Sequence, residues 1–138
     1  MISCTRRIHF DAAHRVMEHK SKCHKLHGHR YVIDATFSAK ELDELGMIID
    51  FGIIKEILGA WIDENWDHNT ILNQKDKKLG EAIAQLTNQK IYYLDANPTA
   101  EKMAEYVKNE VCPKLFANHP VKCVRIKIYE TPNCYAET

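Results

Sequence analysis

Two segments near the start of the chain alternate between apolar and polar residues, and this feature most restricts the fold. In residues 2–13, Ile8, Phe10 and Ala12 occupy every second position. Residues 29–38 (HRYVIDATFS) are rich in β-branched and aromatic side chains. A period of two is typical of a strand. Because consecutive strands are often neighbours, we expect an antiparallel pair in which the end of the first strand lies beside the start of the second.

The rest of the chain mixes helical and strand patterns. Apolar residues at steps of three and four predict helices over residues 51–66, 76–86 and a segment from Thr99 to Pro113. Further strands are predicted at residues 91–94 and 121–130, with a loop at 67–73 (DHNTILN). This order predicts one α+β domain over residues 1–138, with a mostly antiparallel sheet and helices on one face.

Charge and cysteine content indicate which classes of protein this chain could belong to. Lys plus Arg and Asp plus Glu number 19 each, so the formal charge is zero, which argues against a general nucleic-acid binder. No stretch is apolar enough for a signal peptide or a membrane span. The five cysteines are an odd number, so free thiols in a reducing compartment are expected. A cytoplasmic protein without a membrane partner is therefore predicted.

The segment KCHKLHGHRY, residues 22–31, concentrates groups that bind metals or protons. On a strand, His27 and His29 point to the same face. His14 ends the first strand, so antiparallel pairing brings it close to them. Three histidines suit Zn²⁺ and leave its fourth position open, as in catalytic zinc sites. Two alternatives remain: a surface histidine pair, or a closed structural site in which Cys23 is the fourth ligand.

Three other positions are candidates for chemistry. Positive neighbours and a nearby metal would lower the pKa of the Cys23 thiol, although a buried inert cysteine is an equal alternative. Asp67 next to His68 could orient the imidazole and stabilise its charged form, but such a pair is also common in turns. Glu130 ends an apolar strand and could accept paired N–H donors, or simply be solvated.

These pieces together resemble a known family. FDAAHRV, KCHKLHGHRY, MIIDFGIIK, WDHNTILN, NPTAE and YETPNCYA occur in the order seen in the 6-pyruvoyl-tetrahydropterin synthase superfamily. The similarity covers nearly the whole chain, and AAH followed by C-x3-HGH is its most specific part. The three residues between Cys23 and His27 match the bacterial branch that forms 6-carboxy-tetrahydropterin. Residues 74–96 form a longer segment than in the shortest members, expected to add a helix and an edge strand.

The resemblance implies a fold, an assembly and a set of roles. The fold would be the tunnelling fold, an antiparallel four-stranded sheet with two main helices packed on one face. Subunits would form trimers or hexamers, with active sites at subunit interfaces. The implied roles are zinc ligation by His14, His27 and His29, catalysis by Cys23, Asp67 and His68, and pterin binding by Glu130 and Thr99.

The resemblance also implies a reaction. In the carboxy-forming branch, zinc-dependent conversion of 7,8-dihydroneopterin triphosphate gives 6-carboxy-5,6,7,8-tetrahydropterin, acetaldehyde and triphosphate, in the biosynthesis of queuosine. Two alternatives stay open at this point. One is a 6-pyruvoyl-tetrahydropterin synthase, which eliminates triphosphate without carbon–carbon cleavage. The other is a non-catalytic, zinc-stabilised domain that binds a pterin or purine.

Overall fold

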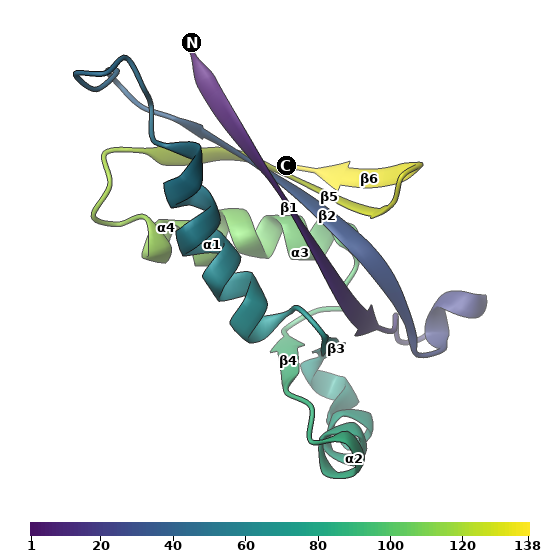
Figure 1. Ribbon diagram of the computed structural model, residues 1–138. Coiled ribbons are helices and arrows are strands. Elements are labelled where there is room, and N and C mark those ends of the chain that lie inside the picture. Colours follow the sequence, from purple (N-terminus) through teal and green to yellow (C-terminus); the bar gives the residue numbers. More distant parts are fainter.

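The computed structural model describes residues 1–138 as one curled, mixed sheet with helices against it (Figure 1). The strands are β1 (Ser3–His14), β2 (His27–Ser38), β3 (Asn69–Asn73), β4 (Ile91–Leu94), β5 (Lys122–Thr131) and β6 (Cys134–Glu137). The helices are α1 (Phe51–Asn65), α2 (Lys77–Thr87), α3 (Ala100–Tyr106) and α4 (Cys112–Leu115). Shorter helical segments are η1 (Lys22–His24), η2 (Gln74–Asp76) and the π-helical η3 (Val107–Val111).

The longest strand pair joins β1 to β2, as the alternation predicts. Pairing is antiparallel and runs without a shift from Ser3 opposite Ser38 to His14 opposite His27. The buried positions of β1, such as Ile8 and Phe10, share one face with the buried positions of β2. We call this the inner face, and α1, α3 and α4 pack against it. The inner-face alternation continues to the end of β1, so it places the last residue of that strand on the same face.

The sheet has six strands, so the predicted four-stranded antiparallel sheet is incorrect in that detail. Its order is β4-β3-β1-β2-β5-β6. The pairs among β1, β2, β5 and β6 are antiparallel, whereas β3 runs parallel to both β1 and β4. Residues 74–96 supply α2 and the edge strand β4, in agreement with the expected extra helix and edge strand.

Residues 67–73, predicted to be a loop, contain β3. Thr70, Ile71 and Leu72 are all buried in succession, so the segment lacks the alternation that marks a half-buried strand. Parallel strands covered on both faces read as short apolar runs instead. The prediction failed because such a run is too short to separate from a loop by its pattern.

A side-chain cap marks the start of α1. The Asp50 carboxylate accepts a hydrogen bond from the Gly52 N–H at 2.6 Å at the start of α1. α1, α3 and α4 add Leu58, Ile62, Met103 and other side chains to one continuous core on the inner face. α2 instead lies at the end of the molecule beside β3 and β4 (Figure 1). No helix combines the length and apolar character needed to cross a bilayer.

Two leucines on helices provide a matched test of this core. Leu58 on α1 is fully buried, whereas Leu86 on α2 is 84% exposed. Leu58→Ala should lower the free energy of unfolding by about 2–5 kcal/mol, because it leaves a cavity. Leu86→Ala should change it by no more than about 0.5 kcal/mol. Urea denaturation followed by circular dichroism measures both values, and equal losses would contradict the position assigned to α1.

Candidate functional site

Three histidines converge at one end of the inner face. The register places His14 opposite His27, and His29 follows two residues later on the same face of β2. The His14 and His27 Nε2 atoms are 3.2 Å apart. One ring nitrogen from each of the three residues lies within 4.8 Å of the others. The structure therefore brings the predicted triad together, because the strand pairing and the alternation act at the same point.

Backbone carbonyls fix the orientation of two of these rings. His14 Nδ1 donates to the Pro98 carbonyl at 2.7 Å, and His27 Nδ1 donates to the Lys25 carbonyl at 2.7 Å. A carbonyl only accepts, so Nδ1 carries the proton in both rings and each Nε2 presents a lone pair. Such outer partners are typical of metal-binding histidines. Burial lowers the pKa of His14 to about 4, so this ring is neutral at pH 7.

The triad fits a divalent metal such as zinc. In the neutral tautomers selected by the carbonyls, the Nε2 atoms of His14 and His27 face each other without a proton between them. The buried Nε2 of His29 also has no hydrogen-bond partner. Nitrogens around tetrahedral zinc are about 3.3 Å apart, given Zn–N distances of about 2.0–2.1 Å. The 3.2 Å between His14 Nε2 and His27 Nε2 matches this spacing, and the nitrogen of His29 lies within 4.8 Å of both. A cation bound between the rings would satisfy their lone pairs.

Glu130 lies next to the triad, as the sequence could not show. Its Oε2 is 3.7 Å from His29 Nε2. Burial lowers the pKa of His29, and the negative charge of Glu130 opposes this shift. Glu130 follows Ile128 on the inner face of β5, and its side chain is 31% exposed. This carboxylate can therefore reach both the triad and the solvent beside it.

Tyr31 is a buried neighbour that sequence reasoning missed. Its ring centroid is 5.5 Å from that of His29 and 5.9 Å from that of His14. The hydroxyl is buried without a hydrogen-bond partner. Burial and the charge of Glu130 raise the pKa of Tyr31, so the phenol stays protonated. The sequence did contain a signal for the position of Tyr31: the period of two continues from His27 and His29 to Tyr31, so all three side chains share one face.

Cys23 lies in η1, in the connection between β1 and β2. Its carbonyl accepts a hydrogen bond from the Val16 N–H at 2.9 Å, which returns this connection to the end of β1. The residue is half-buried. Its thiol is not part of the converging group, which consists of the three histidines alone. A catalytic role for this thiol stays a prediction.

Asp67 and His68 form a tight pair that is anchored to β1. Asp67 accepts from His68 Nδ1 at 2.8 Å and from the Asp11 N–H at 2.9 Å. His68 has a positive φ of 58°, and its own N–H donates to the Asp11 carbonyl at 2.6 Å. Burial favours a higher pKa for Asp67, but these hydrogen bonds outweigh it and lower the pKa. The bond to Asp67 raises the pKa of His68, which is highly exposed.

This pair lies on the outer face of the sheet, away from the triad of the same chain. Asp11 alternates with the inner-face residues of β1, and its carboxylate binds Arg30 on β2 at 2.9 Å. The positive charge of Arg30 also acts on Asp67, and the negative charge of Asp11 acts on His68. Within one chain the structure does not bring Asp67 and His68 together with His14, because the two groups occupy opposite faces.

Residues 97–99 (NPT) hold the chain around the first histidine of the triad in place. The Thr99 hydroxyl, predicted to bind substrate, accepts from the Lys102 N–H at 3.2 Å and caps α3. The Asn97 side chain bonds both the N–H and the carbonyl of Met17 at 3.1 Å, and it accepts from Asn73 at 3.2 Å. Asn97 was not predicted. It fixes the chain just after the triad's first histidine to the loop whose carbonyl orients that histidine.

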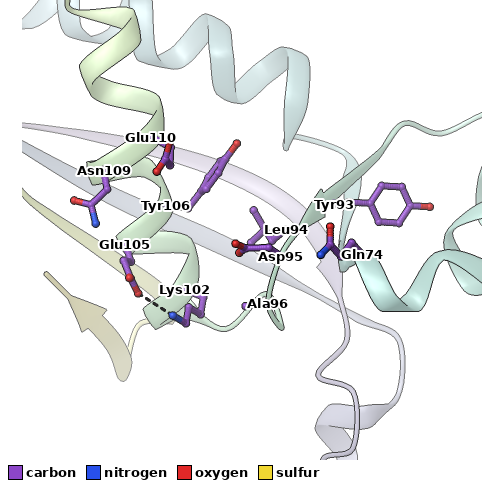
Figure 2. Close-up of a pocket in the computed structure, with 10 residues that line it drawn as sticks. All are labelled: Gln74, Tyr93, Leu94, Asp95, Ala96, Lys102, Glu105, Tyr106, Asn109 and Glu110. Atoms are coloured by element: carbon purple, nitrogen blue, oxygen red, sulfur yellow. Dashed lines mark hydrogen bonds and ion pairs between the residues drawn. The ribbon is translucent and has the colours of Figure 1, made fainter.

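A separate cavity of about 420 Å³ opens between β4 and α3 (Figure 2). Its lining includes Asp95, Glu105 and Glu110 but a single cation, Lys102, which is bonded to Glu105 at 3.1 Å. It contains none of the predicted site residues. An excess of carboxylates repels a phosphorylated ligand, so this cavity is not the substrate site suggested by the triad.

Comparison with known proteins assigns the chain to a protein family. The model of the family described as 6-pyruvoyl tetrahydropterin synthase matches residues 3–138. The chain belongs to this family. A protein of Rickettsia bellii named 6-carboxy-5,6,7,8-tetrahydropterin synthase is 55% identical over 137 residues, which cover 99% of each chain.

Solved structures of this family's fold agree with the architecture. An uncharacterized protein from Wolinella succinogenes has a TM-score of 0.83 at 20% identity, covering 99% of this chain and 97% of its own. The 6-pyruvoyl tetrahydropterin synthase of Caenorhabditis elegans has a TM-score of 0.68 at 20% identity, covering 99% and 94%. At 20% identity, this likeness shows that the chain shares the fold of these two structures.

The geometry of this family member predicts how metal content responds to mutation. His29→Ala should reduce bound zinc from about one ion per chain to well below that, since it removes one of three ligands. His24→Ala is the matched control and should keep the ion, because His24 lies outside the triad. Elemental analysis after dialysis measures the content.

Cys23→Ala separates an open site from a closed one. With an open site the variant keeps both its zinc and its melting temperature. A joint loss of metal and stability would mean that the thiol is a fourth, structural ligand.

Proposed function

We propose that the protein is a zinc-dependent 6-carboxy-5,6,7,8-tetrahydropterin synthase that acts in the cytoplasm, in queuosine biosynthesis. It would convert 7,8-dihydroneopterin triphosphate to the carboxylated pterin, acetaldehyde and triphosphate. The observation that carries the proposal is the set of three converging imidazole nitrogens with a carboxylate beside them. The Rickettsia bellii relative, 55% identical and named for this activity, supports the choice of branch.

His14, His27 and His29 would hold the ion. Zinc, when bound there, supplies a Lewis acid that stabilises negative charge on a substrate oxygen. Glu130 would accept N–H donors from the guanidine-like edge of the pterin ring, through charge-assisted hydrogen bonds. Such an anchor contributes about 1.5–3 kcal/mol of binding. Glu130 lies 3.7 Å from His29. A pterin ring bound to Glu130 would therefore have its own side chain directed towards the triad.

Cys23 and the pair of Asp67 with His68 would move protons. Asp67 favours the charged form of His68, which then has a proton to donate. The thiol of Cys23 would serve as the group that removes a proton on the other side of the substrate. Because the pair lies on the outer face of its own sheet, it would serve the triad of a neighbouring copy. A trimer or a hexamer with sites at subunit interfaces meets this requirement.

Product analysis tests the proposal most directly. Zinc-loaded protein incubated with 7,8-dihydroneopterin triphosphate should release acetaldehyde and form a carboxylated pterin, both measurable by mass spectrometry. Formation of 6-pyruvoyl-tetrahydropterin would instead assign the chain to the pyruvoyl-forming branch. Turnover by neither route would favour the non-catalytic binding domain. Cys23→Ala should lower kcat by about 10²–10⁴-fold, the range for loss of a proton-transfer group.

Mixing two inactive variants tests the sharing of residues between copies. Cys23→Ala and His68→Ala should each be nearly inactive alone. Mixed oligomers, formed by dissociating and reassembling the two variants together, should recover a substantial fraction of wild-type activity. Recovery is expected because some sites combine an intact Cys23 with an intact His68 from another chain. If mixed oligomers form and remain as inactive as the separate variants, the residues act within one chain.

A further inference from the structure

Two cysteines, Cys112 and Cys123, meet on the inner face at the end opposite the triad. The pairing of β5 with β2 contains a bulge: Arg125 lies opposite Thr36, but Cys123 lies opposite Phe37, so Val124 is the extra residue. A bulge shifts the alternation by one position. As a result Cys123 is buried on the inner face, where the unshifted pattern of Ile126 and Ile128 would have placed position 124.

Cys112 approaches the same point from the helical layer. The Phe116 N–H donates to the Cys112 carbonyl at 3.0 Å, so the two residues are one turn apart on one face of α4. The ring of Phe116 packs on Phe37 at 4.6 Å between centroids. Phe37 is the cross-strand partner of Cys123. This chain of contacts places Cys112 over Cys123, and both residues line the same cavity. The Cys123 thiol donates a hydrogen bond to the Arg125 carbonyl at 3.8 Å.

The two thiols lie at the base of a cavity of about 450 Å³, a volume sufficient for a small ligand. Its lining includes Lys108, Lys122 and His119, and no carboxylate. Cys123 is 8% exposed and Cys112 is 1% exposed, so Cys123 is the thiol closer to solvent. The neighbouring Cys112, aided by the charge of Lys108, lowers the pKa of Cys123, whereas Cys123 and burial raise the pKa of Cys112.

We propose that Cys112 and Cys123 form a thiol–disulfide exchange site for small anionic disulfides, of which oxidised glutathione is an example. The thiolate of Cys123 attacks one sulfur of the disulfide and expels the first thiolate. That thiolate takes the proton of Cys112, whose sulfur then attacks the sulfur of Cys123 and expels the second thiolate. This second thiolate takes up the proton that Cys123 released to solvent when it ionised. The protein dithiol is oxidised to one disulfide, and the small disulfide is reduced to two thiols. The cationic lining selects the negative charge.

Oxidised glutathione added to the reduced, full-length protein tests the site. The expected product is a cross-link between Cys112 and Cys123, found by peptide mapping as a loss of two hydrogens. In Cys112→Ser the mixed disulfide with glutathione should persist on Cys123, because no second thiol resolves it. In the matched control Cys134→Ser the cross-link should form as in the wild type, since Cys134 is exposed and does not line the cavity.

The charge of the disulfide provides a second readout. Cystamine, a cationic disulfide, should form the cross-link about tenfold more slowly than oxidised glutathione, because of the cationic lining. The exposed Cys134 of the wild type reports that the reagent is active. If Cys134 is modified while Cys112 and Cys123 both remain free thiols, the proposal is overturned. Equal rates with the two disulfides would overturn the assignment of an anionic ligand.

Discussion

The antiparallel register of β1 with β2 is the constraint on which the candidate site depends. Twelve paired residues without a bulge place His14 opposite His27, and the pleat then adds His29 on the same face. The same alternation sends Asp11 and Arg30 to the other face. A shift of one residue would exchange the two faces and separate the triad. The register therefore defines both the proposed metal face and the charged face that anchors Asp67 and His68.

The surroundings of the histidine rings also make their nitrogens suitable for binding a cation. Burial keeps His14 neutral, and the Pro98 carbonyl occupies its Nδ1–H, so the remaining lone pair points to the other two rings. Glu130 adds a negative charge nearby without belonging to the triad. A neutral set of ligands next to a single carboxylate leaves half of a divalent charge uncompensated. The anionic substrate of the proposed reaction would supply the remaining compensation.

The sequence predicted those parts that depend on local pattern. Strands β1, β2, β4 and β5 and the convergence of the three histidines follow from periodicity and pairing. The sequence did not predict β3, because a fully buried parallel strand lacks alternation, and it did not reveal the roles of Pro98 and Asn97. Both act through contacts with residues about eighty positions away in the chain. The bulge at Val124 was also hidden, since it reverses the alternation on which the strand prediction relied.

The bond between His14 and Pro98 spans 84 positions, and it has a consequence for biosynthesis. While the chain is being made, His14, His27 and His29 leave the ribosome early, but the carbonyl that orients His14 emerges only after two thirds of the protein. The ligand set thus reaches its final geometry late, after the helical layer has begun to form. Small domains often fold around their ion, whereas here the scaffold would form first and the proposed ion would bind afterwards.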